Sequence, residues 1–272
     1  MAKLTIIRNE RYAGAPKERP PLKFAIAAIA TALCLSQAGH AAAEPGLGGK
    51  VYDPYVRNGV TEVEIRGARL TGGSQGGDTT TVVELEKGLN DRVSLALVGE
   101  FEKHPREDAK LDSVGLEGVV YLGQIPNLGV DTGLYLEYEQ RLHNESGVGE
   151  AKLLFAKTIE RFQGLLNLIA ERQFTNRPGE KATEFGYAAS ATWEVATGLR
   201  AGAEAFGDLG TNHRLGGRNP HYIGPTARWE TRPDWLGGGE LELQAGYLFA
   251  AGEARDYTNG QLRLNLEFER RF

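Results

Sequence analysis

Glutamates recur at alternate positions within short apolar segments of this chain. Glu84 and Glu86 flank Leu85, and Glu100 is followed by Glu102 with one residue between them. Carboxylates that share one face repel one another, and burying them without partners is costly. They therefore need water, basic partners or partial protonation, and their spacing favours a polar surface that prefers cations.

Enzymatic chemistry has little support in the sequence. A hydrolytic site needs a serine within hydrogen-bond reach of a histidine and a third group that orients the histidine. His143 and Ser146 form a local cluster of this kind, but they lie in an expected loop, where a merely polar loop is the favoured interpretation. No metal-ligand spacing, phosphate-binding loop or nucleophile elbow is present. The sequence thus predicts no enzyme, no catalytic residue, no metal site and no cofactor.

The segments that carry the glutamates alternate apolar and polar residues with a period of two, which is typical of strands with one apolar face. In residues 92–102, for example, Leu97 and Glu100 lie on opposite faces. Each segment has roughly ten residues, the length that a tilted strand needs to cross a bilayer. An even number of strands is expected for a single-chain bacterial barrel. Twelve segments follow the pattern, at about 60–70, 79–87, 92–102, 113–122, 130–140, 150–160, 165–174, 182–194, 199–207, 221–230, 239–249 and 260–272.

These strands predict an all-β fold, an antiparallel up-and-down transmembrane β-barrel of about 12 strands. Its apolar face would contact outer-membrane lipid, and its polar face would line the lumen. Acids outnumber bases on the polar face, which predicts a water-filled lumen with a negative potential. The predicted lumen-lining residues are Glu84, Glu86, Arg92, Glu100, Glu117, Asp131, Glu137, Lys152, Glu184, Arg200, Glu204, Glu242, Arg263 and Glu267.

Short and long connections alternate along the chain, as the periplasmic turns and extracellular loops of such barrels do. This order predicts that both ends of the barrel lie in the periplasm. Aromatic residues then gather near both rims, as at membrane interfaces, with Tyr138 and Phe174 near the outer rim and Phe162 and Trp193 near the inner rim. The links at the predicted periplasmic end are tight turns at 88–91, 161–164 and 195–198 and somewhat longer links at 123–129 and 231–238. They alternate with the links 71–78, 103–112, 141–149, 175–181, 208–220 and 250–259.

Residues 1–43 are expected to be a cleaved signal peptide. A basic region is followed by an apolar run from Phe24 to Leu35, and Ala41-Ala42-Ala43 offers a small-residue cleavage site. The run is too short to cross a bilayer as a helix. The barrel domain would then be residues 44–272, without Cys34, the one cysteine of the chain. The full chain has a formal net charge of -5, and without residues 1–43, which carry a net positive charge, it is more acidic and has no basic cluster, which argues against nucleic acid as a partner.

The last segment, LRLNLEFERRF (262–272), alternates apolar residues and ends in Phe272. It resembles the terminal strand of bacterial outer-membrane β-barrel proteins, in which this pattern is the assembly signal. The resemblance implies localisation in the bacterial outer membrane and recognition by the barrel-assembly machinery through the C-terminal strand. A soluble exported β-sandwich would also alternate, but it explains neither Phe272 nor the two aromatic bands.

Two functions follow from this fold. The first is a porin-like channel for passive passage of small polar or cationic solutes through an acidic lumen. The second is a non-conducting barrel with a structural or surface-interaction role. Segments 199–207 and 221–230 are weak, and Pro225 interrupts the second, so ten strands remain an alternative to twelve.

Overall fold

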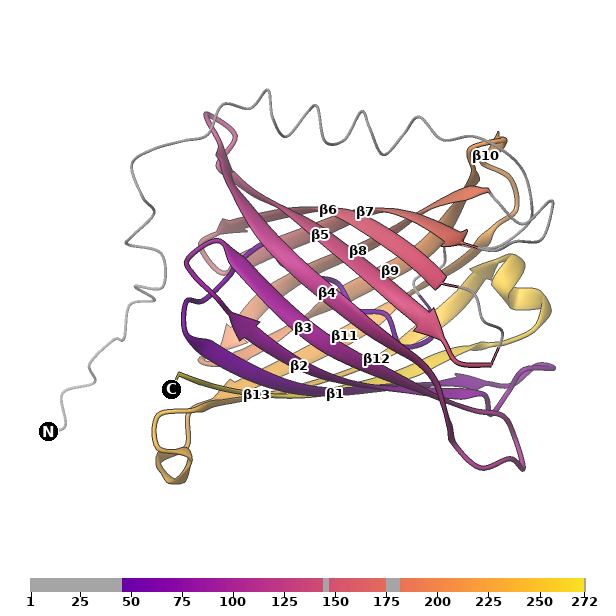
Figure 1. Cartoon of the computed structure of the whole chain (residues 1–272), viewed down its shortest axis with the longest axis horizontal. Helices are drawn as coiled ribbons and strands as arrows, with labels where there is room; N and C mark the ends of the chain where they lie inside the picture. Colours follow the sequence, from indigo (N-terminus) through magenta and orange to yellow (C-terminus); the bar gives the residue numbers. More distant parts are fainter. Residues whose placement is uncertain (1–45, 144–146, 175–181, 272) are drawn as a thin grey trace, which may run out of the picture. The chain divides into compact units, whose positions relative to one another are not determined.

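A computed structural model describes residues 46–143, 147–174 and 182–271 of the chain, which form a closed antiparallel β-barrel (Figure 1). Each strand pairs with its neighbours in the chain, and β1 pairs with β13 along its whole length, from Val60 opposite Arg271 to Thr71 opposite Gly260. The two-residue β10 only pairs with the last residues of β9 and does not form part of the closed wall, so the wall has the predicted twelve strands. Within the described residues, no helix is long and apolar enough to cross a membrane.

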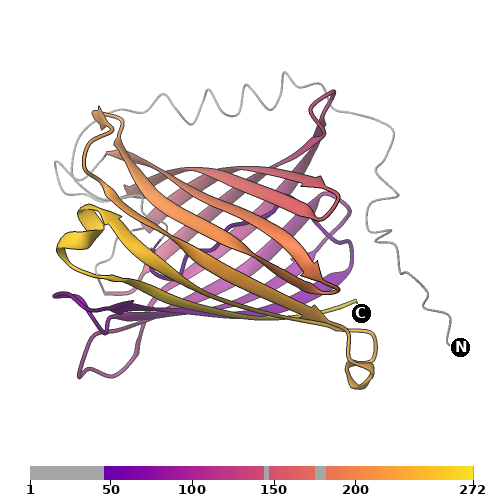
Figure 2. The same ribbon diagram turned by 180° about the vertical axis from the view of Figure 1, so that it is seen from behind.

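The wall strands run in chain order around the barrel, and Figure 2 shows the same wall from behind. Their bounds are β1 (Val60–Thr71), β2 (Thr79–Gly88), β3 (Val93–Lys103), β4 (Lys110–Ile125), β5 (Val130–Arg141), β6 (Gly147–Ile159), β7 (Phe162–Phe174), β8 (Thr183–Ala196), β9 (Leu199–Thr211), β11 (Pro220–Thr231), β12 (Glu240–Gly252) and β13 (Gly260–Arg271), with β10 (Arg214–Leu215) and the 3-10 turns η1 (Asp234–Leu236) and η2 (Glu253–Asp256) in the connections.

The apolar face of the strands points outward. Leu97 is 63% exposed and Ile65 is 47% exposed, whereas Glu64, beside Ile65, is 0% exposed and Ser94, on the other face of the strand that carries Leu97, is 1% exposed. A contiguous apolar surface of this kind is unfavourable in water and marks contact with a membrane or a partner. The belt runs across paired strands, as Leu97 lies opposite both Leu85 and Leu116. The predicted division into two faces is therefore present in the fold.

The two rims of the barrel are distinct. We call the rim where β1 begins and β13 ends the Val60 end, and the opposite rim the Thr71 end. Four described turns at the Val60 end are short, for example residues 160–161 between β6 and β7, but residues 232–239 between β11 and β12 form a longer connection at the same end. Described connections at the Thr71 end, for example residues 72–78 between β1 and β2, are no longer than that exception. The predicted alternation of short and long connections therefore holds except between β11 and β12.

The predicted 208–220 loop is wrong in part. β9 continues to Thr211, and β10 turns back against it, with Arg214 opposite Thr211. Likewise β4 begins at Lys110, earlier than expected. Both extensions project past the apolar belt, where neither face touches lipid. A period of two in hydropathy therefore cannot mark them.

Aromatic side chains pair near each rim. Tyr138 and Phe174 lie 6.3 Å apart between ring centroids near the Thr71 end. Phe162 and Trp193 also lie 6.3 Å apart, at the Val60 end. These pairs fall in the two predicted bands, which is where amphipathic rings favour the membrane interface. Phe272, the predicted assembly signal, lies outside the described residues.

Candidate pore

The inner face of the barrel carries the predicted charged residues. Thirteen of the fourteen lie on strands, at positions that alternate with the exposed apolar side chains. The buried ones are Glu84, Glu117, Lys152, Glu184 and Glu204, and the half-buried ones are Glu86, Glu100, Asp131, Glu137, Arg200, Glu242, Arg263 and Glu267. Arg92 differs, because it lies in the turn before β3 rather than on a strand.

The strand register lines up inward glutamates from one strand to the next. We call this set the acid row, and Ala96 is its one interruption. Because the strands of a barrel tilt, the hydrogen-bonding direction climbs along the barrel axis. The row therefore begins at the first residue of β12, at the Val60 end, and finishes near the start of β8, at the Thr71 end. Its members, in order of pairing, are Glu240, Glu269, Glu62, Glu86, Glu117, Glu137, Glu150, Glu171 and Glu184.

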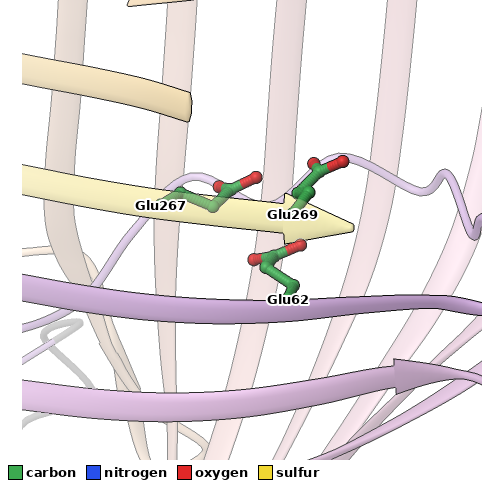
Figure 3. A group of neighbouring side chains, drawn as sticks. All are labelled: Glu62, Glu267 and Glu269. Carbon is green, nitrogen blue, oxygen red and sulfur yellow. The ribbon is translucent and has the colours of Figure 1, made fainter. Parts of the chain in front are cut away.

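Several carboxylates of this face lie close together. Figure 3 shows Glu62 on β1 and Glu267 and Glu269 on β13, with their carboxylates gathered on the inner side of the wall. One oxygen of each lies within 4.8 Å of the others, and the same holds for Glu84, Glu86 and Glu117. Oxygen ligands of this kind suit hard cations, so the groups concentrate negative charge where a cation could reside.

Basic side chains offset part of this charge between β1 and β2. Arg66 Nη1 lies 3.1 Å from Glu64 Oε2 and 2.5 Å from Glu84 Oε2. Lys50 also pairs with Glu64 and lies 3.5 Å from Glu84. Both carboxylates are almost fully buried, and buried charges of this kind are tolerated when they are paired. The remaining oxygens, Glu64 Oε1 and Glu84 Oε1, have no hydrogen-bond partner within the described part of the chain.

Residues 46–59, which we call the internal segment, lie inside the barrel before β1 begins (Figures 1 and 2). Gly48 lies near the Thr71 end, against Val82 of β2, where a Cβ atom would come within 2.6 Å of the valine side chain. Pro54 packs on Gly133 of β5, near the Val60 end, where a Cβ on the glycine would also collide. The segment therefore follows the lumen from one end toward the other.

Asn167 on β7 holds the middle of the internal segment. Its side-chain oxygen accepts a hydrogen bond from the backbone N–H of Tyr52 at 2.8 Å, and its amide nitrogen donates to the Tyr52 carbonyl at 2.8 Å. Asn167 is 0% exposed. The side-chain amide of Asn167 thus bonds to both backbone groups of Tyr52, as the backbone of a neighbouring strand would.

The Tyr52 ring lies among charged lumen residues. Its hydroxyl donates to Glu117 Oε2 at 3.4 Å, and its ring centroid is 4.6 Å from that of Tyr135. Lys152 Nζ lies over both rings, 4.4 Å and 4.2 Å from their centroids. Such contacts of a cation with aromatic faces are stabilising, so the segment is packed as part of the core.

The ends of the internal segment are also bound to the wall. Arg66 Nε donates to the Gly48 carbonyl at 2.8 Å. At the other end Arg57 forms an ion pair with Glu269, and Arg271 Nη2 donates to the Asn58 carbonyl at 2.7 Å. Contacts at both ends and in the middle therefore fix the segment in the lumen.

The internal segment therefore occupies part of the predicted water-filled lumen. A cavity of about 460 Å³ remains at the Thr71 end, with Leu47 in its wall. A second cavity of about 20 Å³ lies beside Val51 and Arg228. Nothing in the sequence indicated that Lys50 and Tyr52, which precede the first strand, lie in the lumen.

The loop histidines show no sign of a hydrolytic pair. His104 Nδ1 lies 3.1 Å from Asp78 Oδ1, and this contact raises the pKa of His104 above its ordinary value. His143 Nδ1 lies 3.6 Å from Asp112. Ser146, the predicted partner of His143, lies outside the described residues. These two contacts are with carboxylates, Asp78 in the connection after β1 and Asp112 on β4.

The barrel fold is similar to that of a solved outer-membrane channel. The chain is similar to the COG4313 outer membrane channel from Pseudomonas putida F1, with a TM-score of 0.54 and 12% identity over 84% of this chain and 99% of that one. The KdgM porin in complex with disordered oligogalacturonate gives a TM-score of 0.49 at 10% identity, over 78% of this chain and 99% of that one. No protein-family profile matches the sequence, and no curated protein matches it either.

Proposed function

We propose that the chain forms a narrow channel in the bacterial outer membrane for small polar and cationic solutes, after export through a signal peptide at residues 1–43. The observation that carries this proposal is the acid row, because it supplies carboxylates from one rim to the other along the inner wall. Glu117 and Glu184, both 2% exposed, each have an oxygen with no partner in the described part of the chain. Rings and rows of carboxylates favour cations over anions in membrane pores.

The direct test is single-channel recording of the folded mature chain in planar bilayers, with a salt gradient across the membrane. We expect small, steady openings with a reversal potential on the cation-selective side. Heat-dependent gel migration would confirm that the protein is folded. Silence from folded protein, or anion preference, would contradict the proposal.

Replacing Glu137, Glu171 and Glu184 together with Gln should reduce the cation preference of the channel. The substitution removes three charges of the acid row and keeps side chains of the same size, so the reversal potential should move toward zero. The matched control is Glu160→Gln together with Glu107→Gln, since both residues are exposed in connections. An equal change in both variants would show that overall charge, and not the acid row, sets the selectivity.

The internal segment favours a second candidate, a barrel that does not conduct while the segment is seated. It would serve a structural or surface-interaction role through its longer connections at the Thr71 end. This candidate predicts silence of the native chain in the recording described above.

The variant Asn167→Ala separates the two candidates. It removes both hydrogen bonds to Tyr52, each worth about 0.5–1.5 kcal/mol, so the fraction of channels with a displaced segment should rise by about tenfold. We expect more frequent or larger openings in bilayer recordings. Asn265→Ala is the control, because the side-chain oxygen of this Asn has no hydrogen-bond partner in the described part of the chain. Unchanged recordings for Asn167→Ala would show that the segment does not limit conduction.

A further inference from the structure

The cavity at the Thr71 end has the properties of a binding site. Its volume is about 460 Å³, within the range of about 300–1,000 Å³ that small-molecule sites occupy. Its walls come from strands far apart in the sequence, β1 with Leu70 and β9 with Asp208, and Leu47 of the internal segment closes part of it. A site built from such distant elements is held open by the barrel itself.

The charge of its wall has one sign. Asp208 and Glu253 line the cavity, and none of the residues that line it is Lys, Arg or His. Asp208 is 7% exposed, and its Oδ1 accepts the backbone N–H of Gly210. That hydrogen bond fixes the carboxylate at the cavity wall. Glu253 lies on η2, and its backbone N–H bonds to the Asn219 carbonyl at 3.1 Å, which holds η2 against the mouth.

The rest of the wall combines apolar and aromatic side chains with three neutral polar ones, Gln75, Asn219 and Gln261. Leu70 is 7% exposed and Tyr222 is 3% exposed, and Leu47 and Tyr257 pack against the same buried cluster. Tyrosine faces attract cations, and they also accept apolar groups. An inorganic ion would leave this part of the wall without a partner, and an anion would face two carboxylates.

We propose that this cavity binds a small organic cation. The charged nitrogen would face Asp208 and Glu253, and the apolar body would lie against Leu47, Leu70 and the two tyrosines. This site is separate from the acid row and adds a recognition step at the mouth of the barrel. Binding here requires no conduction, so it can be tested apart from the channel.

The test uses three para-fluorinated probes with nearly the same shape and different charge: phenethylammonium, 2-phenylethanol and phenylacetate. Each is titrated against the folded mature chain in micelles of a non-ionic maltoside, and ¹⁹F relaxation reports the bound fraction. We expect saturable binding of the ammonium probe, at least tenfold weaker binding of the alcohol, and none of the carboxylate. The alcohol also measures partition into the micelle. Equal affinity for ammonium and alcohol would overturn the proposal.

Two variants tie the binding to the cavity. Asp208→Asn keeps an acceptor for the Gly210 N–H and should weaken binding of the ammonium probe about tenfold, with the alcohol unchanged. Glu253→Gln changes an exposed residue of η2, so it should fold normally and weaken binding in the same direction. Glu107→Gln, on an outer loop away from the cavity, is the matched control and should have no effect. Unchanged affinity in both cavity variants would refute the assignment.

Discussion

Replacing Arg66 with Met should lower the free energy of unfolding by about 3–5 kcal/mol, because it removes one partner from a buried charge network. The guanidinium contacts Glu64 and Glu84, which are 0% and 1% exposed. Its loss would leave Lys50 alone to offset both carboxylates. It would also free the Gly48 carbonyl and loosen the internal segment. Urea unfolding of the barrel in lipid vesicles, followed by gel migration, measures the change.

Arg232→Met is the matched control for this prediction. Arg232 is also paired with a glutamate, since its Nη2 lies 2.7 Å from Glu240, but its side chain is 57% exposed. Exposed pairs of this kind contribute about 0–1 kcal/mol. Equal losses in the two variants would mean that burial of the Arg66 network does not govern its contribution.

Leu97→Arg should cost about 2–4 kcal/mol, because it places a charge on the lipid-facing surface near the middle of the membrane. Leu97 is central in β3 and is 63% exposed on the outer surface. The loss should appear as a lower midpoint of urea unfolding in vesicles. It should be absent from a soluble β-sandwich, where an exposed Leu→Arg change is harmless.

Leu128→Arg provides the comparison for the lipid-facing change. Leu128 is 57% exposed but lies in the turn between β4 and β5, outside the belt. The same substitution there should change stability by only a few tenths of a kcal/mol. A tolerated Leu97→Arg would mean that this face of β3 does not contact lipid.

The strands and their two faces could be predicted from the sequence because a period of two leaves no ambiguity about which residues share a face. Leu97 and Glu100 are separated correctly by parity alone. The alternation does not show how far along the barrel axis a residue lies, because that position depends on the register between neighbouring strands. The acid row depends on that register, since Glu62, Glu86 and Glu117 meet only in the observed one.

The internal segment could not be predicted in the same way. Residues 46–59 have no hydropathy period, because each side chain meets a different part of the inner wall. Tyr52 is fixed by Asn167, which lies 115 residues later in the chain. Asn167 alternates with Leu166 and Leu168, so parity puts it on the polar face, but nothing in its local sequence distinguishes it from a water-exposed lumen residue. The same lack of a local signal concealed the extension of β9 beyond the belt.

The seam between β1 and β13 has a consequence for the time course of folding. Val60 must meet Arg271, so the wall can close only after the strands between them have formed, and pairings this distant in sequence are slow to form. Arg57 and Asn58 are bound by Glu269 and Arg271 beside that same seam. The pairing of β1 with β13, which closes the wall, therefore also binds Arg57 and Asn58 at the end of the internal segment. Closure of the barrel wall and placement of the internal segment in the lumen are thus coupled during assembly.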